Sequence, residues 1–137
     1  MSGKNFLLGA TAVVMAIAAT PMVAFASDET FLASLAKLGS RDAGIKSIVT
    51  QVGDDNNIKM AKGICSILED PEVETVKDLV NGVVTENFFD IPAPKLSGTS
   101  QQKTKSILGY LIITTQAGVP EYCSQHKPKL TNLFKTK

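Results

Sequence analysis

The sequence has a single histidine, and its carboxylates, although numerous, are badly arranged for acid–base chemistry. Its one histidine, His126, follows the last predicted core residue and lies in a lysine-rich stretch. A nucleophilic enzyme needs a base beside its nucleophile, and a solvated histidine in a tail is poorly placed for that task. Glu74 and Asp78 are spaced i, i+4, which is typical of the exposed surface of a helix. The sequence therefore predicts no catalytic residues and no enzymatic activity.

Motifs for phosphate and metal binding are also missing. Residues 98–100 (Gly-Thr-Ser) lack the spacing of a phosphate-binding P-loop. Residues 54–57 (Asp-Asp-Asn-Asn) could begin a calcium loop, but the sixth position of an EF-hand needs glycine and is Lys59 here. We expect this segment to form a turn with helix-capping side chains. We expect neither a cofactor nor a metal ion.

Charge of one sign is not in excess. The chain has 14 lysines and arginines against 13 acidic residues, a formal net charge of +1. Binding to nucleic acid requires a basic surface, so no nucleic-acid partner is predicted. Residues 27–94 carry a net charge of about −6 and residues 95–137 about +6. This asymmetry could steer the protein to a charged partner, but attraction between the two halves of one folded domain is the simpler explanation.

Residues 1–26 have the pattern of a secretory signal peptide. A lysine near the start is followed by an uncharged, mostly apolar segment at 6–19, and Ala24 and Ala26 are the small residues of a cleavage site before Ser27. The alternative is an uncleaved membrane anchor, because residues 6–26 are about long enough to span a bilayer. No cysteine lies near the cleavage site, which excludes a lipid-anchored lipoprotein. We expect cleavage and export to the cell envelope or the extracellular space.

The two cysteines, Cys65 and Cys123, are predicted to form a disulfide. An even number of cysteines in a small exported domain favours a disulfide. Closing a loop of about 58 residues would remove unfolded-chain entropy worth roughly 4 kcal/mol. Free thiols are one alternative. A metal site is another, but it would need His126 as a third ligand and would lack a fourth.

Apolar residues recur at helical spacing nearly throughout the chain. The i, i+3, i+4, i+7 pattern predicts apolar stripes on helices within residues 31–38, 45–52, 58–68, 73–84 and 107–115. The predicted fold is therefore all-α, a small bundle of four or five short helices stapled by one disulfide. The predicted organisation along the chain is a signal peptide at 1–26, a helical domain at 27–123 and a basic flexible tail at 124–137.

Capping residues, glycines and prolines predict where these helices begin and end. In chain order, we expect an N-cap at Ser27 or Asp28, helix ends at Gly39 and Gly53, a helix start at Asp70-Pro71, a capping box from Thr99 to Gln102, and a break or bend at Gly118 and Pro120.

The connector expected at residues 87–98 is the first candidate for binding. It places large apolar groups in a non-helical segment, namely Phe88, Phe89, Ile91 and Pro92. Aromatic side chains in a loop can anchor a partner, or they can cover the core of their own bundle. The sequence leaves both open. The leading hypothesis is a non-enzymatic module that binds a protein or an envelope component through this connector.

The tail is the second candidate. Apolar and basic residues alternate there, namely Lys127, Lys129, Leu130, Leu133, Phe134 and Lys135. Such a segment could fold weakly onto an anionic membrane surface or an acidic protein, or it could stay disordered in solvent. Membrane-surface association through this tail is the alternative function.

Three short segments resemble the actinobacterial secreted family called domain of unknown function 732, which is abundant in mycobacteria. They are DETFLASL at 28–35, GICSIL at 63–68 and YCSQH at 122–126. The resemblance implies a signal peptide, a small helical domain and two cysteines in comparable places. It implies no activity, and it assigns no functional residues.

Overall fold

The computed structural model describes the backbone of residues 20–135 and the side chains of residues 27–134. Most of the predicted signal peptide, residues 1–19, and the side chains of Ala24, Ala26 and Lys135 lie outside this part. The chain divides into two units, residues 1–30 and residues 31–137. Between residues 20 and 135 the chain forms α- and 3₁₀-helices and no strand, which confirms the all-α prediction.

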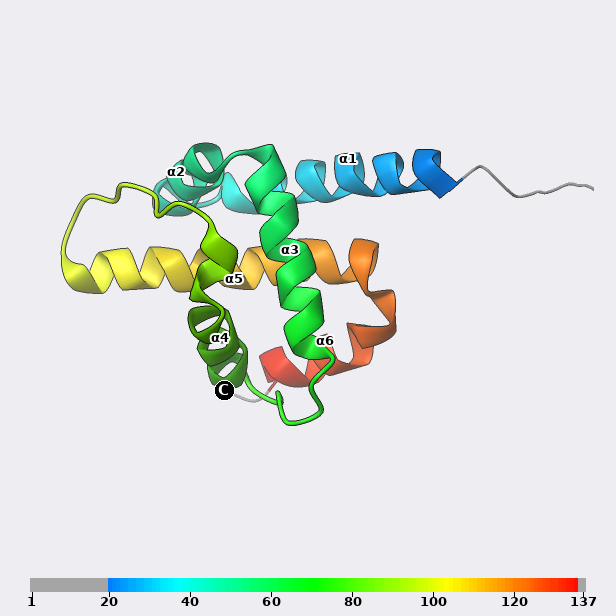
Figure 1. Ribbon diagram of the computed structural model, residues 1–137. Helices are drawn as coiled ribbons and strands as arrows, with labels where there is room; N and C mark the ends of the chain where they lie inside the picture. The colour runs from blue at the N-terminus through cyan, green and yellow to red at the C-terminus, as the bar shows by residue number, and fades with distance from the viewer. Residues whose placement is uncertain (1–19, 136–137) are drawn as a thin grey trace, which may run out of the picture. The chain divides into compact units, whose positions relative to one another are not determined.

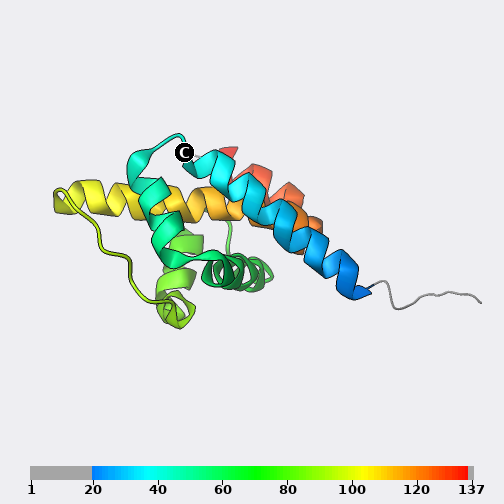
Figure 2. The same ribbon diagram turned by 90° about the horizontal axis from the view of Figure 1, so that it is seen from above.

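Six α-helices follow one another along the described chain (Figure 1). They are α1 (Thr20–Gly39), α2 (Ala43–Val52), α3 (Asp54–Leu68), α4 (Val76–Thr85), α5 (Ser100–Tyr122) and α6 (Lys127–Lys135). Two short 3₁₀ segments, η2 (Asn87–Asp90) and η3 (Ser124–His126), follow α4 and α5. Figure 2 shows the extended chain that leads from η2 to the start of α5.

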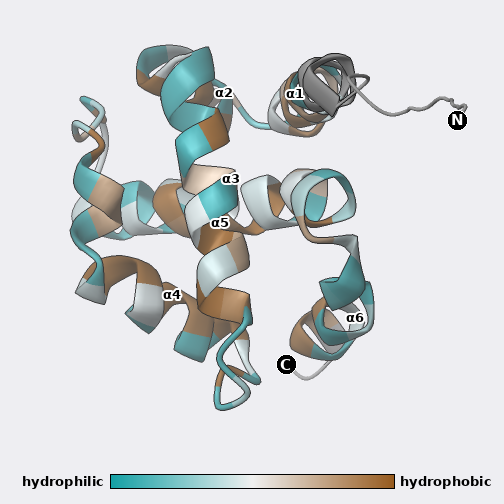
Figure 3. Ribbon diagram, turned by 45° about the vertical axis from the view of Figure 1, so that its right-hand side comes forward, coloured by the Kyte–Doolittle hydropathy of each residue, from teal (hydrophilic) through white to brown (hydrophobic). Residues whose placement is uncertain are grey.

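Helix α5 is the centre of the unit formed by residues 31–137. It contacts α2, α3 and α6, and α3 crosses it (Figure 1). The buried side chains come from most elements of this unit, including Ile48, Ile64, Leu79, Leu111 and Leu133. A smaller cluster joins Phe31 and Leu35 to Ala61 and Ala117. In Figure 3, hydrophobic and hydrophilic residues alternate along α4, as expected for an amphipathic helix with one buried face.

Several predicted helix ends are confirmed. Gly53, with φ 87°, closes α2, and its amide donates to the carbonyl oxygen of Val49. The capping box at the start of α5 is formed as predicted: the Gln102 amide donates to the Thr99 hydroxyl, and the Thr99 amide donates to the Gln102 side chain. These ends are set by contacts within one helical turn, which is why sequence identifies them.

The expected starts of three helices are wrong. Helix α1 begins at Thr20, so Ser27 and Asp28 lie inside it and not at its N-cap. Helix α3 includes the segment 54–57 that was expected to be a turn. Helix α4 begins at Val76 and not at Asp70-Pro71.

Helix α4 begins later than predicted because a better N-cap lies further along the chain. The Asp70 carboxylate accepts a hydrogen bond from the Glu72 amide at 2.9 Å, which closes a local turn. At Thr75 the hydroxyl accepts from the Asp78 amide, and the Asp78 carboxylate accepts from the amides of Thr75 and Glu74. The bond from the Glu74 amide has the largest effect on the pKa of Asp78, and it lowers that pKa, as do the bonds from Thr75. The capping box therefore fixes the helix start.

The break or bend expected at Gly118 and Pro120 does not end the helix, because α5 continues to Tyr122. Proline lacks the amide that would bond to the carbonyl four residues before it. Here that loss falls in the last turn, and the ladder resumes with a bond from the Cys123 amide to the Val119 oxygen at 3.0 Å. The nearby disulfide and buried Val119 hold this end of the helix in place.

Residues 124–135, predicted as part of a flexible tail, form η3 and α6. The Leu133 side chain is fully buried in the main core. The Lys129 ammonium donates to the carbonyl oxygens of Leu68, at 2.9 Å, and Asp70, at 2.6 Å, at and just after the C-terminal end of α3. Packing against a distant part of the chain therefore orders this segment.

Candidate functional site

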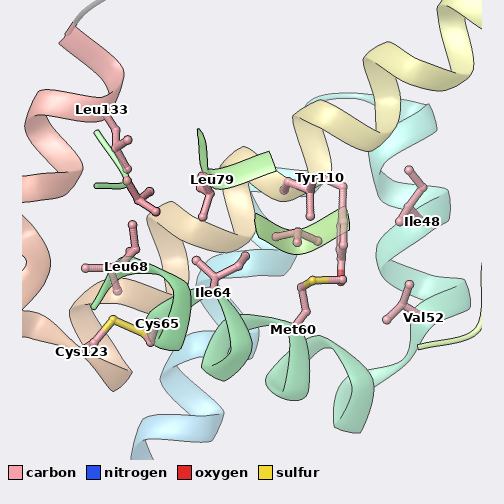
Figure 4. Close-up of a cluster of buried hydrophobic side chains, with 14 residues drawn as sticks. Ile48, Val52, Met60, Ile64, Cys65, Leu68, Leu79, Tyr110, Cys123 and Leu133 are labelled. Carbon is pink, nitrogen blue, oxygen red and sulfur yellow. A yellow bond between two sulfur atoms is a disulfide. The ribbon is translucent and has the colours of Figure 1, made fainter. Parts of the chain in front are cut away.

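The predicted disulfide is present between Cys65 on α3 and Cys123 at the end of α5. The two sulfurs are 2.07 Å apart and the two Cα atoms 5.9 Å apart. Figure 4 shows this bond at one end of the buried cluster, with Met60, Tyr110, Ile48 and Val52 towards the other end. The disulfide is structural, and the candidate site lies at the far end of the cluster.

A buried pair of polar side chains forms the floor of this far end. The Tyr110 hydroxyl donates to the Asn57 side-chain oxygen at 2.6 Å, and Asn57 in turn donates to the Val49 carbonyl oxygen at 3.1 Å. Both side chains are nearly inaccessible to solvent, at 3% for Tyr110 and 1% for Asn57. Burial raises the pKa of Tyr110 well above its usual value, although the Thr114 hydroxyl opposes this shift. The phenol therefore stays protonated and bonded to Asn57.

Above this floor lies a pocket of about 380 Å³, which we call the connector pocket. Its inner wall comes from α2, α3 and α5, and its outer wall from η2 and the chain after it. The lining residues are Ile48, Val52, Met60, Asn87, Phe88, Asp90, Ile91, Pro92, Ala93, Pro94, Ile107 and Tyr110. Most of these side chains are apolar, which suits the pocket to an apolar group.

The outer wall begins in an unusual backbone turn. Asn87, Phe88, Phe89 and Asp90 all have positive φ angles, between 52° and 62°. Non-glycine residues normally adopt this left-handed conformation singly, and each costs roughly 1–2 kcal/mol. Such strain persists only where the surrounding structure enforces it, and it occurs often at ligand-binding segments.

Two sets of contacts enforce the turn. The Phe89 ring lies directly over Gly63 of α3, so close that a methyl group added there would come within 2.5 Å of the ring. Further along, the amide of Lys95 donates to the Gln51 side-chain oxygen, and the Gln51 side-chain nitrogen donates to the Lys95 carbonyl oxygen, each at 2.8 Å. The connector is therefore attached to α3 at one end and to α2 at the other.

The connector residues predicted to bind a partner are divided between two roles. Phe88, Phe89 and Ile91 are half-buried and pack against the main core. Pro92 is exposed at the rim of the connector pocket. The alternative in which the connector covers the core thus applies to the first three, while Phe88, Ile91 and Pro92 also line the connector pocket.

Sequence reasoning missed the inner wall. Ile48, Val52, Met60, Ile107 and Tyr110 were placed only by their apolar spacing, or not at all. Their place around a cavity depends on how α2, α3 and α5 meet, and no local pattern encodes that.

The tail residues predicted to contact lipid are also divided. Leu133 is buried and the Lys129 ammonium is bonded to backbone, so both are engaged within the fold. Lys127 is exposed, and Leu130 and Phe134 are half-buried. The side chain of Lys135 lies outside the described residues.

His126 differs from its prediction. Its side chain is half-buried, and its Nε2 atom is buried without a hydrogen-bond partner within the described part of the chain. The predicted solvated tail histidine is therefore wrong, because η3 folds this residue against the end of α5.

Among the side chains of residues 27–134, no three His, Cys, Asp or Glu groups converge as metal ligands would. None of the helices between residues 20 and 135 combines the length and hydrophobicity needed to cross a bilayer.

Comparison of the chain with known proteins finds no matching family model, no matching curated protein and no matching solved structure. The resemblance to the secreted family named above therefore stays a prediction, and the candidate function depends on the geometry of the connector pocket.

Proposed function

We propose that this protein is an exported, non-enzymatic binding module that takes an apolar group of an envelope component into the connector pocket. The observation that carries the proposal is an apolar cavity of about 380 Å³ walled by a strained connector. Ligand pockets typically measure about 300–1,000 Å³ and are lined mainly by apolar and aromatic side chains. The connector pocket has both properties.

Export is supported by the signal-like start of the sequence and by the Cys65–Cys123 disulfide. Disulfides persist in oxidising compartments outside the cytosol. A binding role is also consistent with the chemistry of the site: the Tyr110 phenol is protonated and bonded to Asn57, so it is poorly suited to act as a base.

The test uses a side chain that blocks the pocket mouth without touching the core. Ala93 is exposed and lines the pocket, so Ala93→Trp should fill the mouth at little cost in stability. Ala36 on α1 is also exposed but does not line the pocket, so Ala36→Trp is the matched control.

The probe is N-phenyl-1-naphthylamine, a neutral apolar dye whose fluorescence rises when it leaves water. We expect the wild-type protein and the Ala36→Trp variant to enhance the emission of the dye. The Ala93→Trp variant should lose most of that enhancement. Equal enhancement by both variants, or none by the wild type, would refute binding in this pocket. Unfolding curves of the three proteins check that they are equally folded.

A further inference from the structure

Few polar groups surround the connector pocket, and together they favour one head-group charge of a ligand over the other. At the floor, the Tyr110 hydroxyl uses its one proton in the bond to Asn57, and Asn57 itself is not among the residues that line the pocket. The floor therefore offers no free donor to an anionic head group. Burying a charged group there without a partner would be costly, so the head group of a ligand must stay at the mouth.

The mouth carries negative charge. Among the described residues that line the pocket, Asp90 is the only charged one, and its side chain is exposed. Its carboxylate oxygen lies 3.5 Å from the Asn87 side-chain nitrogen, which is a weak contact. The next acidic residue along the chain, Glu86, lines a neighbouring groove between α3 and α4. Lys95 lies outside the lining, and its backbone is bonded to Gln51.

The left-handed turn fixes the position of this carboxylate. Asp90 has φ 62°, and the bond from the Ile91 amide to the Phe88 oxygen at 3.1 Å closes the turn. The carboxylate thus sits on the same short segment that supplies Phe88 to the pocket wall. An apolar body inside the pocket would bring its polar end to this segment.

From this arrangement we propose that the connector pocket selects amphiphiles whose apolar body ends in a positively charged group, such as an ammonium or a guanidinium. The inference rests on the proposed function, because it assigns the chemistry of the ligand that enters the same pocket. The apolar walls hold the body by excluding water. Asp90 holds the cationic end by charge attraction and by accepting its hydrogen bonds.

The size of the pocket suits a body of modest length. A dry apolar cavity of about 150 Å³ accepts a molecule the size of benzene, and the connector pocket is larger, at about 380 Å³. Each buried methylene contributes about 0.8 kcal/mol. Because that is about a fourfold change in dissociation constant, shortening an alkyl chain by two methylenes inside the pocket should weaken binding roughly 15-fold.

The charge preference should be smaller, because Asp90 is exposed. Ion pairs in solvent are worth about 0.2–1 kcal/mol. This corresponds to about a 1.5- to 5-fold preference for a cationic over a neutral head group, and salt should reduce it.

The experiment measures displacement of N-phenyl-1-naphthylamine by octylamine, octanol and nonanoate, which share an octyl tail and differ in head charge at neutral pH. Hexylamine tests the dependence on chain length. We expect octylamine to bind more tightly than octanol, and octanol more tightly than nonanoate. Asp90→Asn should remove the difference between octylamine and octanol, because asparagine keeps the shape and tolerates positive φ. Glu86→Gln, which removes an acid outside the pocket, should preserve it.

The outcomes separate the two proposals. If hexylamine binds much more weakly than octylamine but head charge makes no difference, or if Asp90→Asn leaves the preference intact, the inference on ligand charge is wrong and the pocket function stands. If none of the four compounds displaces the dye, or if chain length has no effect, the pocket function itself is wrong.

Discussion

Removing the Tyr110 hydroxyl isolates one buried hydrogen bond that the structure places at the floor of the connector pocket. In Tyr110→Phe the ring and its packing remain, but the Asn57 side-chain oxygen loses its donor at 2.6 Å. Asn57 is only 1% exposed, so water cannot easily replace that donor. A buried polar group left without a partner costs about 1–3 kcal/mol. We expect the free energy of unfolding to fall by about 2 kcal/mol.

The assay is equilibrium unfolding in urea, followed by circular dichroism, for a set of variants that form a double-mutant cycle. Asn57→Leu alone removes the acceptor of the Tyr110 hydroxyl, while the Val49 oxygen keeps its bond from the Gly53 amide at 3.2 Å. The double variant removes both polar groups. Because no orphan remains there, it should be less destabilised than the sum of the two single variants by at least about 1 kcal/mol.

The measured slope of the unfolding free energy against urea decides whether the comparison is valid. An unchanged slope means that the native and unfolded states expose the same surface in all variants. If the slopes agree and the two single effects add to within about 0.3 kcal/mol, the hydroxyl and the amide are not coupled. That result would refute the buried pair and, with it, our description of the pocket floor.

Three further predictions concern the disulfide, the connector and alkaline pH. Replacing Cys65 and Cys123 together by serine should lower stability by roughly 4 kcal/mol through release of the unfolded chain, measured by urea unfolding. Gly63→Ala should cost about 1–3 kcal/mol, because the new methyl group meets the Phe89 ring at 2.5 Å. Burial raises the folded-state pKa of Tyr110 above the usual value of 10.0. The associated stability is therefore complete below about pH 10 and is lost as pH rises further.

Each of these has its own check. Adding a reductant to the wild-type protein should reproduce the effect of the serine variant, and no effect of reductant on stability would contradict a structural role for the disulfide. A variant that combines Gly63→Ala with Phe89→Leu should regain part of the lost stability, because the smaller side chain vacates the ring position. Tyr110→Phe should flatten the alkaline decline in stability; an unaltered decline would assign it to other groups.

Local patterns in the sequence were reliable where the physics is local. The apolar spacing predicted the helices, Gly53 predicted the end of α2, and Thr99 with Gln102 predicted the start of α5. Each of these depends on residues within one or two turns of each other. The disulfide was also predictable, because two cysteines allow only one intramolecular pairing.

Competing local signals produced the errors. Asp70-Pro71 is a good helix start by composition, but the capping box from Thr75 to Asp78 satisfies more backbone amides. Pro120 is a strong helix breaker, but at the last turn of α5 it removes little. In both places the sequence contained competing local signals, and the stronger signal determined where the helix begins or ends.

The sequence by itself determined the helical class, the covalent link between Cys65 and Cys123, and the helix ends at Gly53 and Thr99, because contacts over a few residues and a single possible pairing are enough to specify them. Only the tertiary structure decided that Asn57 bonds to Tyr110, that the segment after α5 forms a helix with Leu133 in the core, and that residues 87–94 wall a pocket. Those features join residues tens of positions apart. Their free energies arise only when the helices pack and exclude water, so no short stretch of sequence contains them.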